Sequence, residues 1–292
     1  MTEPLAPLPS NENLPEDRQP HPSAPPPAAP ESRPPPEWRS VWWQELIIAA
    51  KYLTRLRLPL RGLPDRAQIG GALTWFPLIG ALVGAFGGLI DGIGVKILHL
   101  PSPITSCFAV LGMMWLTRGL HEEQLAGLAN QYGDLSGKHR RVGWLGEERA
   151  VRYGTIALFF IILLRIAAIN SLDNLEIVLA TLIASGAWSH ALISVAAAWL
   201  RPAAGDPVAD HFGQPQAFRV MVALGLGAAT VLAVMPGGAA LALLVSGVMA
   251  VAVIFAATRL FGGYYNGALL GTLQQLTDLA VICALVAAQT LD

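Results

Sequence analysis

The sequence predicts an all-α protein, a polytopic integral membrane bundle of about seven helical spans that follows a disordered, Pro-rich N-terminal tail. Of the 292 residues, 53% are hydrophobic and 13% are charged, about half the charged share of an ordinary soluble domain. The mean hydropathy is +0.50. The apolar blocks show no alternation of period two, and a chain in lipid must satisfy its backbone hydrogen bonds internally, which favours helices.

Net charge and cysteine content exclude further classes. The formal net charge of -1 provides no basic face for a phosphate backbone, so we expect no nucleic acid partner. The two cysteines, Cys107 and Cys283, lie far apart inside apolar runs, which argues against a disulfide framework and against a thiolate metal site. We expect both to be buried structural residues.

Residues 1–37 form the predicted tail, and residues 38–292 form the predicted membrane domain. The tail holds 13 of the 22 prolines, and proline fixes φ and removes a backbone donor. A solvated tail is the simpler interpretation, and a ligand for a Pro-binding module is the alternative.

The stretch 38–66 is predicted to be an interfacial helix and loop. Trp42 and Trp43 lie among apolar residues at helical spacing, and Arg55, Arg57 and Arg66 follow. Tryptophan at the headgroup level with arginine beside it is typical of the cytoplasmic membrane surface.

Seven apolar stretches follow, and a span needs about 20 residues. The segment 104–117 is short for a span, and 71–98 is long enough to tilt or to break at Pro77. The count of seven carries an uncertainty of one span. The stretches are 71–98, 104–117, 155–171, 175–200, 218–235, 238–258 and 269–290. The glycines within them, such as Gly80 and Gly84, predict close helix packing.

The charges of the connecting loops predict the orientation. Connections 99–103, 172–174 and 236–237 contain neither Lys nor Arg. The loops on the other side carry the cations, which places them in the cytoplasm by the positive-inside rule. These cations are Arg118, Lys138, Arg140, Arg141, Arg149, Arg152, Arg201 and Arg259. We therefore expect a multi-pass protein of the bacterial inner membrane, with its tail and polar loops cytoplasmic.

A polar stretch, 115–155, lies between two apolar blocks and contains a large share of the ionisable groups. It is the predicted functional region. Arg165, His190 and Asp278 lie within spans, where ionisable side chains are costly and indicate a polar site that faces the bundle interior.

Six segments occur in the order seen in the cobalamin synthase family, adenosylcobinamide-GDP ribazoletransferase. They are KYLTRLRLP (51–59), TWFPLIGALVGA (74–85), LTRGLHEEQLAGLAN (116–130), RYGTIAL (152–158), and NGALLG with QLTDLAVICAL (266–271 and 275–285). The resemblance runs from about residue 45 to the C-terminus. It implies Mg²⁺-dependent transfer of the adenosylcobinamide phosphate from adenosylcobinamide-GDP to α-ribazole or its 5′-phosphate, with release of GMP.

The family's acidic motif is only partly present. It reads approximately His-x-Asp-Gly-x-x-Asp-x-x-Asp, and this chain has His121, Glu123, Gln124, Gly127 and Asn130 at those positions. Carboxylates at i, i+4 and i+7 share one helix face and could share a metal ion. In this chain, that face offers one carboxylate and one carboxamide.

The resemblance implies the following site residues. The catalytic candidates are His121, Glu123, Asn130 and Asp278. The substrate-binding candidates are Arg118, Arg149, Arg152 and Thr155, since arginine forks suit a pyrophosphate. The candidate Mg²⁺ ligands are Glu123, Asn130, Asp134 and Glu147.

Each candidate also has a simpler interpretation. His121 can cap a helix, Glu123 can lie on a solvated helix face, Arg149 and Arg152 can anchor a loop at the membrane, and Asp134 can form a turn. At the level of the whole protein, the alternative is a catalytically silent relative that binds or assembles corrinoid enzymes. A transporter is a more distant alternative, because no paired interrupted helices are evident. A homo-oligomer and an assembly with membrane-associated corrinoid enzymes both stay open.

Overall fold

The structure is a computed structural model that describes residues 39–60, 62–135, 146–172 and 174–289. For residues 39–40, 133–135 and 146–152 it describes only the backbone. The described residues belong to one compact unit. The predicted Pro-rich tail, 1–37, lies outside the described residues.

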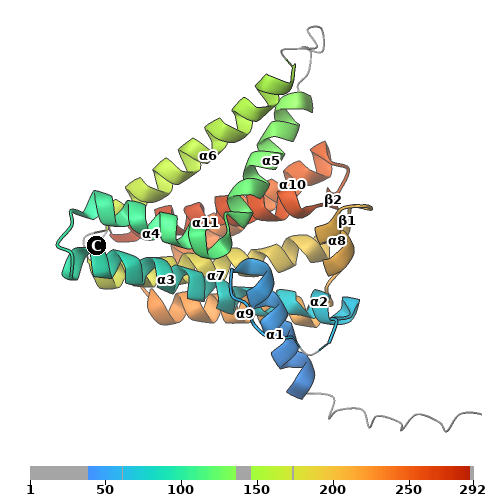
Figure 1. The fold of residues 1–292 in the computed structure, drawn as a ribbon, viewed down its shortest axis with the longest axis horizontal. Coiled ribbons are helices and arrows are strands. Elements are labelled where there is room, and N and C mark those ends of the chain that lie inside the picture. Colours follow the sequence, from blue (N-terminus) through green and yellow to red (C-terminus); the bar gives the residue numbers. More distant parts are fainter. Residues whose placement is uncertain (1–38, 61, 136–145, 173, 290–292) are drawn as a thin grey trace, which may run out of the picture. The chain divides into compact units, whose positions relative to one another are not determined.

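Helices dominate the described residues, as predicted (Figure 1). In chain order the elements are α1 (Arg39–Leu53), α2 (Arg66–Ala72), the short 3₁₀ helix η1 (Leu73–Trp75), α3 (Phe76–Lys96), α4 (Ser102–Thr117), α5 (Leu120–Leu135), α6 (Gly146–Asn170), α7 (Leu175–Trp199), β1 (Arg201–Pro202), α8 (Pro207–Phe212), α9 (Ala217–Val234), α10 (Ala239–Leu260), β2 (Tyr264–Tyr265) and α11 (Gly267–Gln289).

Six helical segments of the described chain are long and apolar enough to cross a membrane: Arg66–Lys96, Tyr153–Asn170, Leu175–Trp199, Ala217–Val234, Ala239–Leu260 and Gly267–Gln289. The seventh predicted stretch is α4, a shorter apolar helix of 16 residues. At 1.5 Å per residue it is about 24 Å long, less than the hydrocarbon core of about 30 Å. The predicted helical membrane bundle is confirmed.

The first span, predicted to tilt or to break at Pro77, stays helical and narrows to a 3₁₀ turn directly before this proline. There η1 separates α2 from α3, and Pro77 occupies the first turn of α3. Proline lacks an N–H and its ring excludes the carbonyl of residue i−4, here Leu73, from an α-helical hydrogen bond. The tighter 3₁₀ turn at 73–75 follows from this exclusion.

Small residues bring α3 and α7 close together. A Cβ at Gly80 would overlap the carbonyl of Gly186, and one at Gly84 would overlap the carbonyl of Leu182. These glycines therefore act as packing residues, as expected for helices in lipid. α7 and α11 are the most buried candidate spans, at 72% and 78%, so they form the centre of the described bundle.

Exposed apolar side chains cover the outer helices. α6, α9 and α10 are only 22–28% buried. The prediction that both cysteines are buried is wrong for Cys283, which is exposed, and Cys107 is half-buried. Cys283 occupies an exposed position of α11, although most of that helix is buried. An apolar run therefore does not show that every residue in it is buried inside the protein, because lipid can replace the core as the apolar environment.

Several backbone contacts join the connections at one end of the bundle. The Arg55 N–H donates to the Leu116 carbonyl at 2.9 Å. β1 and β2 pair in parallel, with Arg201 opposite Tyr264. Asp206 accepts hydrogen bonds from the Ala209 and Gly267 amides. These contacts join the loop after α1 to the end of α4, and the loop after α7 to the loop after α10. The edge-to-face contact of Tyr52 in α1 with Phe212 in α8 connects the two sets on one side of the bundle.

The glycine contact between α3 and α7 makes a testable prediction. We expect Gly84→Ala to destabilise the protein by about 1–3 kcal/mol, because the new methyl group overlaps the backbone of α7. The matched control is Gly225→Ala on α9, where a Cβ meets no atom within 4 Å. Thermal unfolding in detergent measures the difference, and equal midpoints for the two variants would contradict the proposed contact.

Candidate functional site

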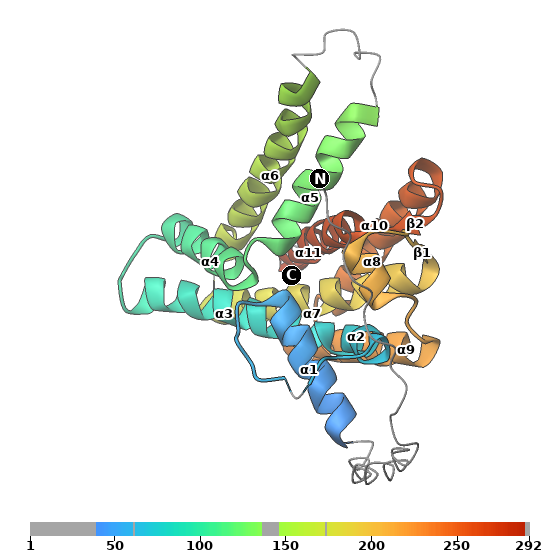
Figure 2. The same cartoon turned by 45° about the vertical axis from the view of Figure 1, so that its right-hand side comes forward.

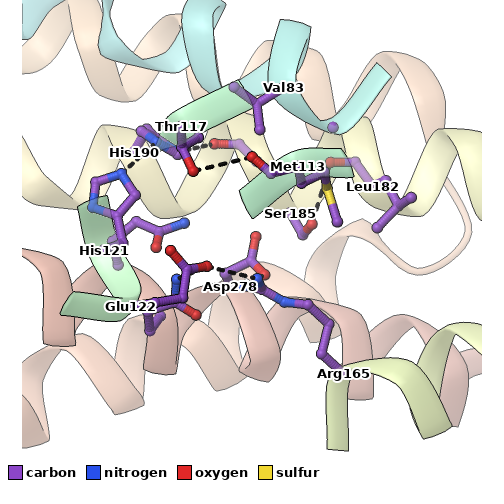
Figure 3. A pocket seen from close by; sticks show the side chains of 14 residues that line it. Val83, Met113, Thr117, His121, Glu122, Arg165, Leu182, Ser185, His190 and Asp278 are labelled. Atoms are coloured by element: carbon purple, nitrogen blue, oxygen red, sulfur yellow. Dashed lines mark hydrogen bonds and ion pairs between the residues drawn. The ribbon is translucent and has the colours of Figure 1, made fainter. Parts of the chain in front are cut away.

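A small polar cavity lies where six helices meet (Figure 3). Its volume is about 30 Å³, enough for one or two water molecules. α3, α4, α5, α6, α7 and α11 each contribute to its lining: Val83, Gly84, Met113, Thr117, His121, Glu122, Arg165, Leu182, Ser185, Gly186, His190, Gln274, Gln275 and Asp278.

A left-handed turn between α4 and α5 directs two of these side chains inward. Arg118 and Gly119 have φ values of 61° and 66°. The Gly119 N–H donates to the Met114 carbonyl at 2.8 Å, which closes the end of α4. α5 then starts at Leu120, so His121 and Glu122 face α7 and α11.

The cavity contains a buried group of three ionisable side chains. The Arg165 guanidinium on α6 bonds Asp278 on α11 and lies 3.7 Å from a Glu122 oxygen on α5. The Gln275 amide donates to the same Glu122 oxygen at 2.9 Å. All three charged residues are at most 6% exposed, and pairing offsets the desolvation cost of such buried charges.

Two histidines form a second buried pair beside this group. The Nε2 atoms of His121 and His190 lie 3.2 Å apart, and His190 Nδ1 lies 2.7 Å from the Gly186 carbonyl. A carbonyl only accepts, so His190 Nδ1 carries the proton. For two neutral rings, His121 Nε2 then donates to His190 Nε2, and His121 Nδ1 holds the lone pair. That atom is buried, and besides His190 the described side chain that hydrogen-bonds the His121 ring is Gln124.

Gln124 fills the space that two glycines of α11 leave. A Cβ at Gly271 would overlap the Gln124 side chain, and one at Gly267 would lie 3.3 Å from its amide nitrogen. Gln124 also bonds the Tyr52 hydroxyl, and burial raises the pKa of Tyr52 to about 12. The tyrosine therefore stays protonated at neutral pH.

The structure brings two of the predicted catalytic residues, His121 and Asp278, into the same cavity. Arg165 and His190, which the sequence marked as ionisable groups inside spans, join them there. Glu123 does not, because its side chain is exposed on the other face of α5. Its predicted roles as catalytic residue and metal ligand stay predictions.

Asn130 links α5 to α6. Its side-chain oxygen accepts a hydrogen bond of 2.6 Å from the Gly154 N–H, and a Cβ at Gly154 would overlap the Asn130 side chain. Asn130 thus has a structural contact whether or not it also binds a metal ion. Figures 1 and 2 show α5 and α6 running side by side in opposite directions.

Arg118 and Thr155 lie outside the cavity lining. Arg118 is exposed and donates to the carbonyls of Lys51 and Tyr52 at the end of α1, and Thr155 is exposed on α6. Asp134 lies in the last turn of α5, and Glu147, Arg149 and Arg152 lie in the first turns of α6, where the structure describes only the backbone.

Glu122, Gln274 and Gln275 were not predicted to belong to the site. The helical phase of α5 would have indicated Glu122, because it lies three residues before the buried Leu125 and thus on the same face. Gln274 and Gln275 are polar residues within a predicted span, which is itself a signal for a polar, bundle-facing position.

Oxygen atoms without partners suit a hard cation at this cavity. Glu122 Oε2, Gln274 Oε1 and Gln275 Oε1 are buried and form no hydrogen bond with described residues. Two carboxylates face one guanidinium, and Mg²⁺ prefers such oxygen donors, often with one or two carboxylates. Within the described part of the chain, however, no group of three or more His, Cys, Asp or Glu side chains is arranged to hold a metal ion.

The fold and the cavity define a polytopic helical membrane protein with an ion-paired, histidine-containing polar centre. The family model described as cobalamin-5-phosphate synthase matches residues 45–286. The chain belongs to this family. The match starts within α1 and ends within α11, so it includes every helix that lines the cavity.

Curated relatives show the same similarity over most of their length. A protein of Azorhizobium caulinodans is 34% identical over 75% of this chain and 84% of its own. Proteins of Sinorhizobium medicae and Escherichia coli are 30% and 28% identical, over 85% and 80% of this chain and over 97% and 96% of their own lengths. All three are named adenosylcobinamide-GDP ribazoletransferase. No solved structure matches the chain.

The buried His121 makes the stability of the fold depend on pH. Burial lowers its pKa from 6.5 to about 4, and the nearby Arg165 guanidinium acts in the same direction. Between these values the unfolded chain binds a proton that the folded chain does not, so stability is lost as pH falls from 6.5 toward 4. From pH 7 to pH 5 we expect a loss on the order of 2 kcal/mol from this residue.

Thermal unfolding at both pH values measures this loss. His121→Gln should lose less stability on acidification than the wild-type chain, whereas His211→Gln, which alters an exposed histidine, should behave like wild type. If His121→Gln loses as much stability between pH 7 and pH 5 as the wild-type chain, His121 is not the source of the pH dependence.

The buried ion pair makes a second prediction. We expect Arg165→Leu to cost about 3–5 kcal/mol, because it leaves two buried carboxylates without their cation. Combining it with Asp278→Leu should cost less than the two single losses together. Arg259→Leu, at an exposed arginine, should cost less than about 0.5 kcal/mol. Denaturant unfolding in detergent measures the free energy of unfolding of the wild type, the two single variants and the double variant. If the losses of the single variants add exactly in the double variant, Arg165 and Asp278 do not interact.

Proposed function

We propose that the chain transfers the adenosylcobinamide phosphate group from adenosylcobinamide-GDP to α-ribazole or its 5′-phosphate and releases GMP. The family match over residues 45–286 carries this proposal. The names of the curated relatives support it. The alternative of a catalytically silent relative is not favoured, because the relatives matched over most of their length are named as the transferase.

The reaction sets three tasks for the protein. The ribazole hydroxyl forms a bond to the phosphorus next to adenosylcobinamide, the bond from that phosphorus to the GMP oxygen breaks, and the hydroxyl proton is removed. We assign the proton to His121 Nδ1, since Nε2 already donates to His190. Arg165 is a positioning residue, because it holds Glu122 on α5 and Asp278 on α11 in register.

The bulk of both substrates has to lie outside the cavity, whose volume of about 30 Å³ admits only water-sized groups. We propose that the face of α5 and α6 next to the cavity receives them. Arg149, Arg152 and Thr155 on α6 are the candidate contacts for the phosphates, because guanidinium forks match phosphate oxygens. Arg118, in the turn before α5, instead contacts the end of α1.

Mg²⁺ is part of this proposal. It would neutralise charge on the phosphate oxygens during the transfer. Two sets of donors are candidates: Glu123, whose carboxylate is exposed, with the sequence candidates Asn130, Asp134 and Glu147, and the buried oxygens of Glu122, Gln274 and Gln275. The carboxylate of Glu123 is accessible to a substrate phosphate.

We place the protein in the bacterial inner membrane with its polar loops in the cytoplasm. Arg55, Arg118, Arg201 and Arg259 lie in or beside connections that the contacts above join at one side of the bundle. Lys96, in the last turn of α3, is the cation at the other end among described residues. The bias toward one side supports this orientation.

The adjacent residues Glu122 and Glu123 allow a sharp test. Purified protein in nanodiscs is given adenosylcobinamide-GDP, α-ribazole and Mg²⁺, and cobalamin and GMP formation is followed. We expect Glu123→Gln to lower kcat/KM by about a hundredfold with unchanged thermal stability, because loss of an exposed metal ligand removes catalysis and no packing. Glu122→Gln should lower both activity and stability.

The matched control is Glu176→Gln, an exposed glutamate at the start of α7, which should retain wild-type activity. If Glu123→Gln equals this control while Glu122→Gln is inactive, the buried oxygens form the metal site instead. Absence of product from folded wild-type protein would overturn the proposed function.

A further inference from the structure

We propose that a basic pocket on the outer face of α4 binds the phosphate of an anionic phospholipid from the cytoplasmic leaflet. The pocket has a volume of about 720 Å³ and lies between the loop after α1 and the end of α4. Its lining is Lys51, Thr54, Arg55, Leu56, Arg57, Leu58, Pro59, Trp115 and Arg118. This site is separate from the central cavity and does not depend on the transfer reaction.

Backbone hydrogen bonds fix the wall of the pocket. The Arg55 N–H donates to the Leu116 carbonyl at 2.9 Å, and the Thr54 hydroxyl donates to the Ala50 carbonyl at 2.6 Å. Arg118 donates to the carbonyls of Lys51 and Tyr52, which caps the C-terminal end of α1. The loop is thereby held against α4, while the side chains of Arg55 and Arg57 remain exposed.

The charge of the pocket selects an anion. Of the described residues that line it, four are cationic and none is acidic. Arginine forks match the oxygens of a phosphate and are weakly hydrated, which suits a site at the membrane surface. A phosphate group is therefore the expected ligand chemistry.

An apolar stripe on α4 indicates that this phosphate belongs to a lipid. Ile104, Phe108, Leu111 and Trp115 are 43–58% exposed, and their spacing places them on one helix face. Met113 and Thr117, which line the central cavity, lie on the opposite face. From residue 104 to residue 115 the stripe is about 17 Å long, close to the depth of one hydrocarbon leaflet.

The stripe ends at Trp115, which also lines the basic pocket. The Arg55 guanidinium lies 5.1 Å from the centre of this indole ring. An acyl chain along α4 would thus lead directly to a headgroup in the pocket, with tryptophan at the interfacial level. A soluble nucleotide would use the cations and leave the stripe without a role, so the lipid accounts for both features.

The test measures lipid binding to the purified full chain in detergent by native mass spectrometry, with phosphatidylglycerol as the probe and phosphatidylcholine as the uncharged comparison. The test variant is Arg55→Gln with Arg57→Gln. The matched control is Arg66→Gln with Arg259→Gln, which removes two exposed arginines elsewhere on the same side.

We expect the wild-type chain to prefer phosphatidylglycerol, and the test variant to bind it on the order of twentyfold more weakly, or about fivefold for each lost cation. The control pair should change binding by less than about threefold. Addition of GDP should not displace the lipid.

Three results would overturn the proposal. The first is an equal loss of phosphatidylglycerol binding in the test variant and the control variant. The second is equal binding of the two lipids by the wild-type chain. The third is displacement of phosphatidylglycerol by GDP, which would assign the pocket to a nucleotide. If the test variant unfolds, the single change Arg57→Glu in the exposed loop replaces it. It should likewise weaken phosphatidylglycerol binding, and unchanged binding would overturn the proposal.

Discussion

The contact of Arg165 with Asp278 and Glu122 is the constraint on which the interior of this bundle depends. It joins the consecutive helices α5 and α6 to α11, which lies far along the chain. An isolated charge in an apolar environment is costly. Each of the three side chains therefore stabilises the fold only while its oppositely charged partner stays in place. The ion-paired group therefore fixes how the polar helix α5 is inserted between the apolar spans.

The packing of α3 against α7 provides the other half of the framework. Gly80 and Gly186 let the two backbones approach, and this approach brings His190 beside the end of α4, where His121 enters. Van der Waals contact at small residues replaces the hydrophobic effect as the force between helices in lipid. The position of the histidine pair is thus a consequence of glycine packing one turn away.

The sequence predicted most of the fold because hydropathy reports directly on membrane insertion. The spans and the 3₁₀ turn before Pro77 follow from apolar length and from proline geometry. The burial of Cys283 was wrongly predicted, because an apolar residue in a span can face either protein or lipid. Sequence alone marked Arg165, His190 and Asp278 as an interior polar site, yet it passed over Glu122, since neighbouring glutamates differ only in helical phase. That phase is set by the left-handed turn at Arg118 and Gly119, which composition does not reveal.

Gln124 on α5 packs against Gly267 and Gly271 on α11, which are remote from it in sequence. The family pattern has glycine where this chain has Gln124, so the large side chain lies on α5 and the free volume lies on α11. A return to glycine at 124 alone would leave a void between the helices and remove the partner of the Tyr52 hydroxyl. A larger residue at 271 alone would collide with the amide. The side-chain volumes at positions 124 and 271 are therefore coupled, so that a substitution on α5 is accommodated only with a compensating change on α11.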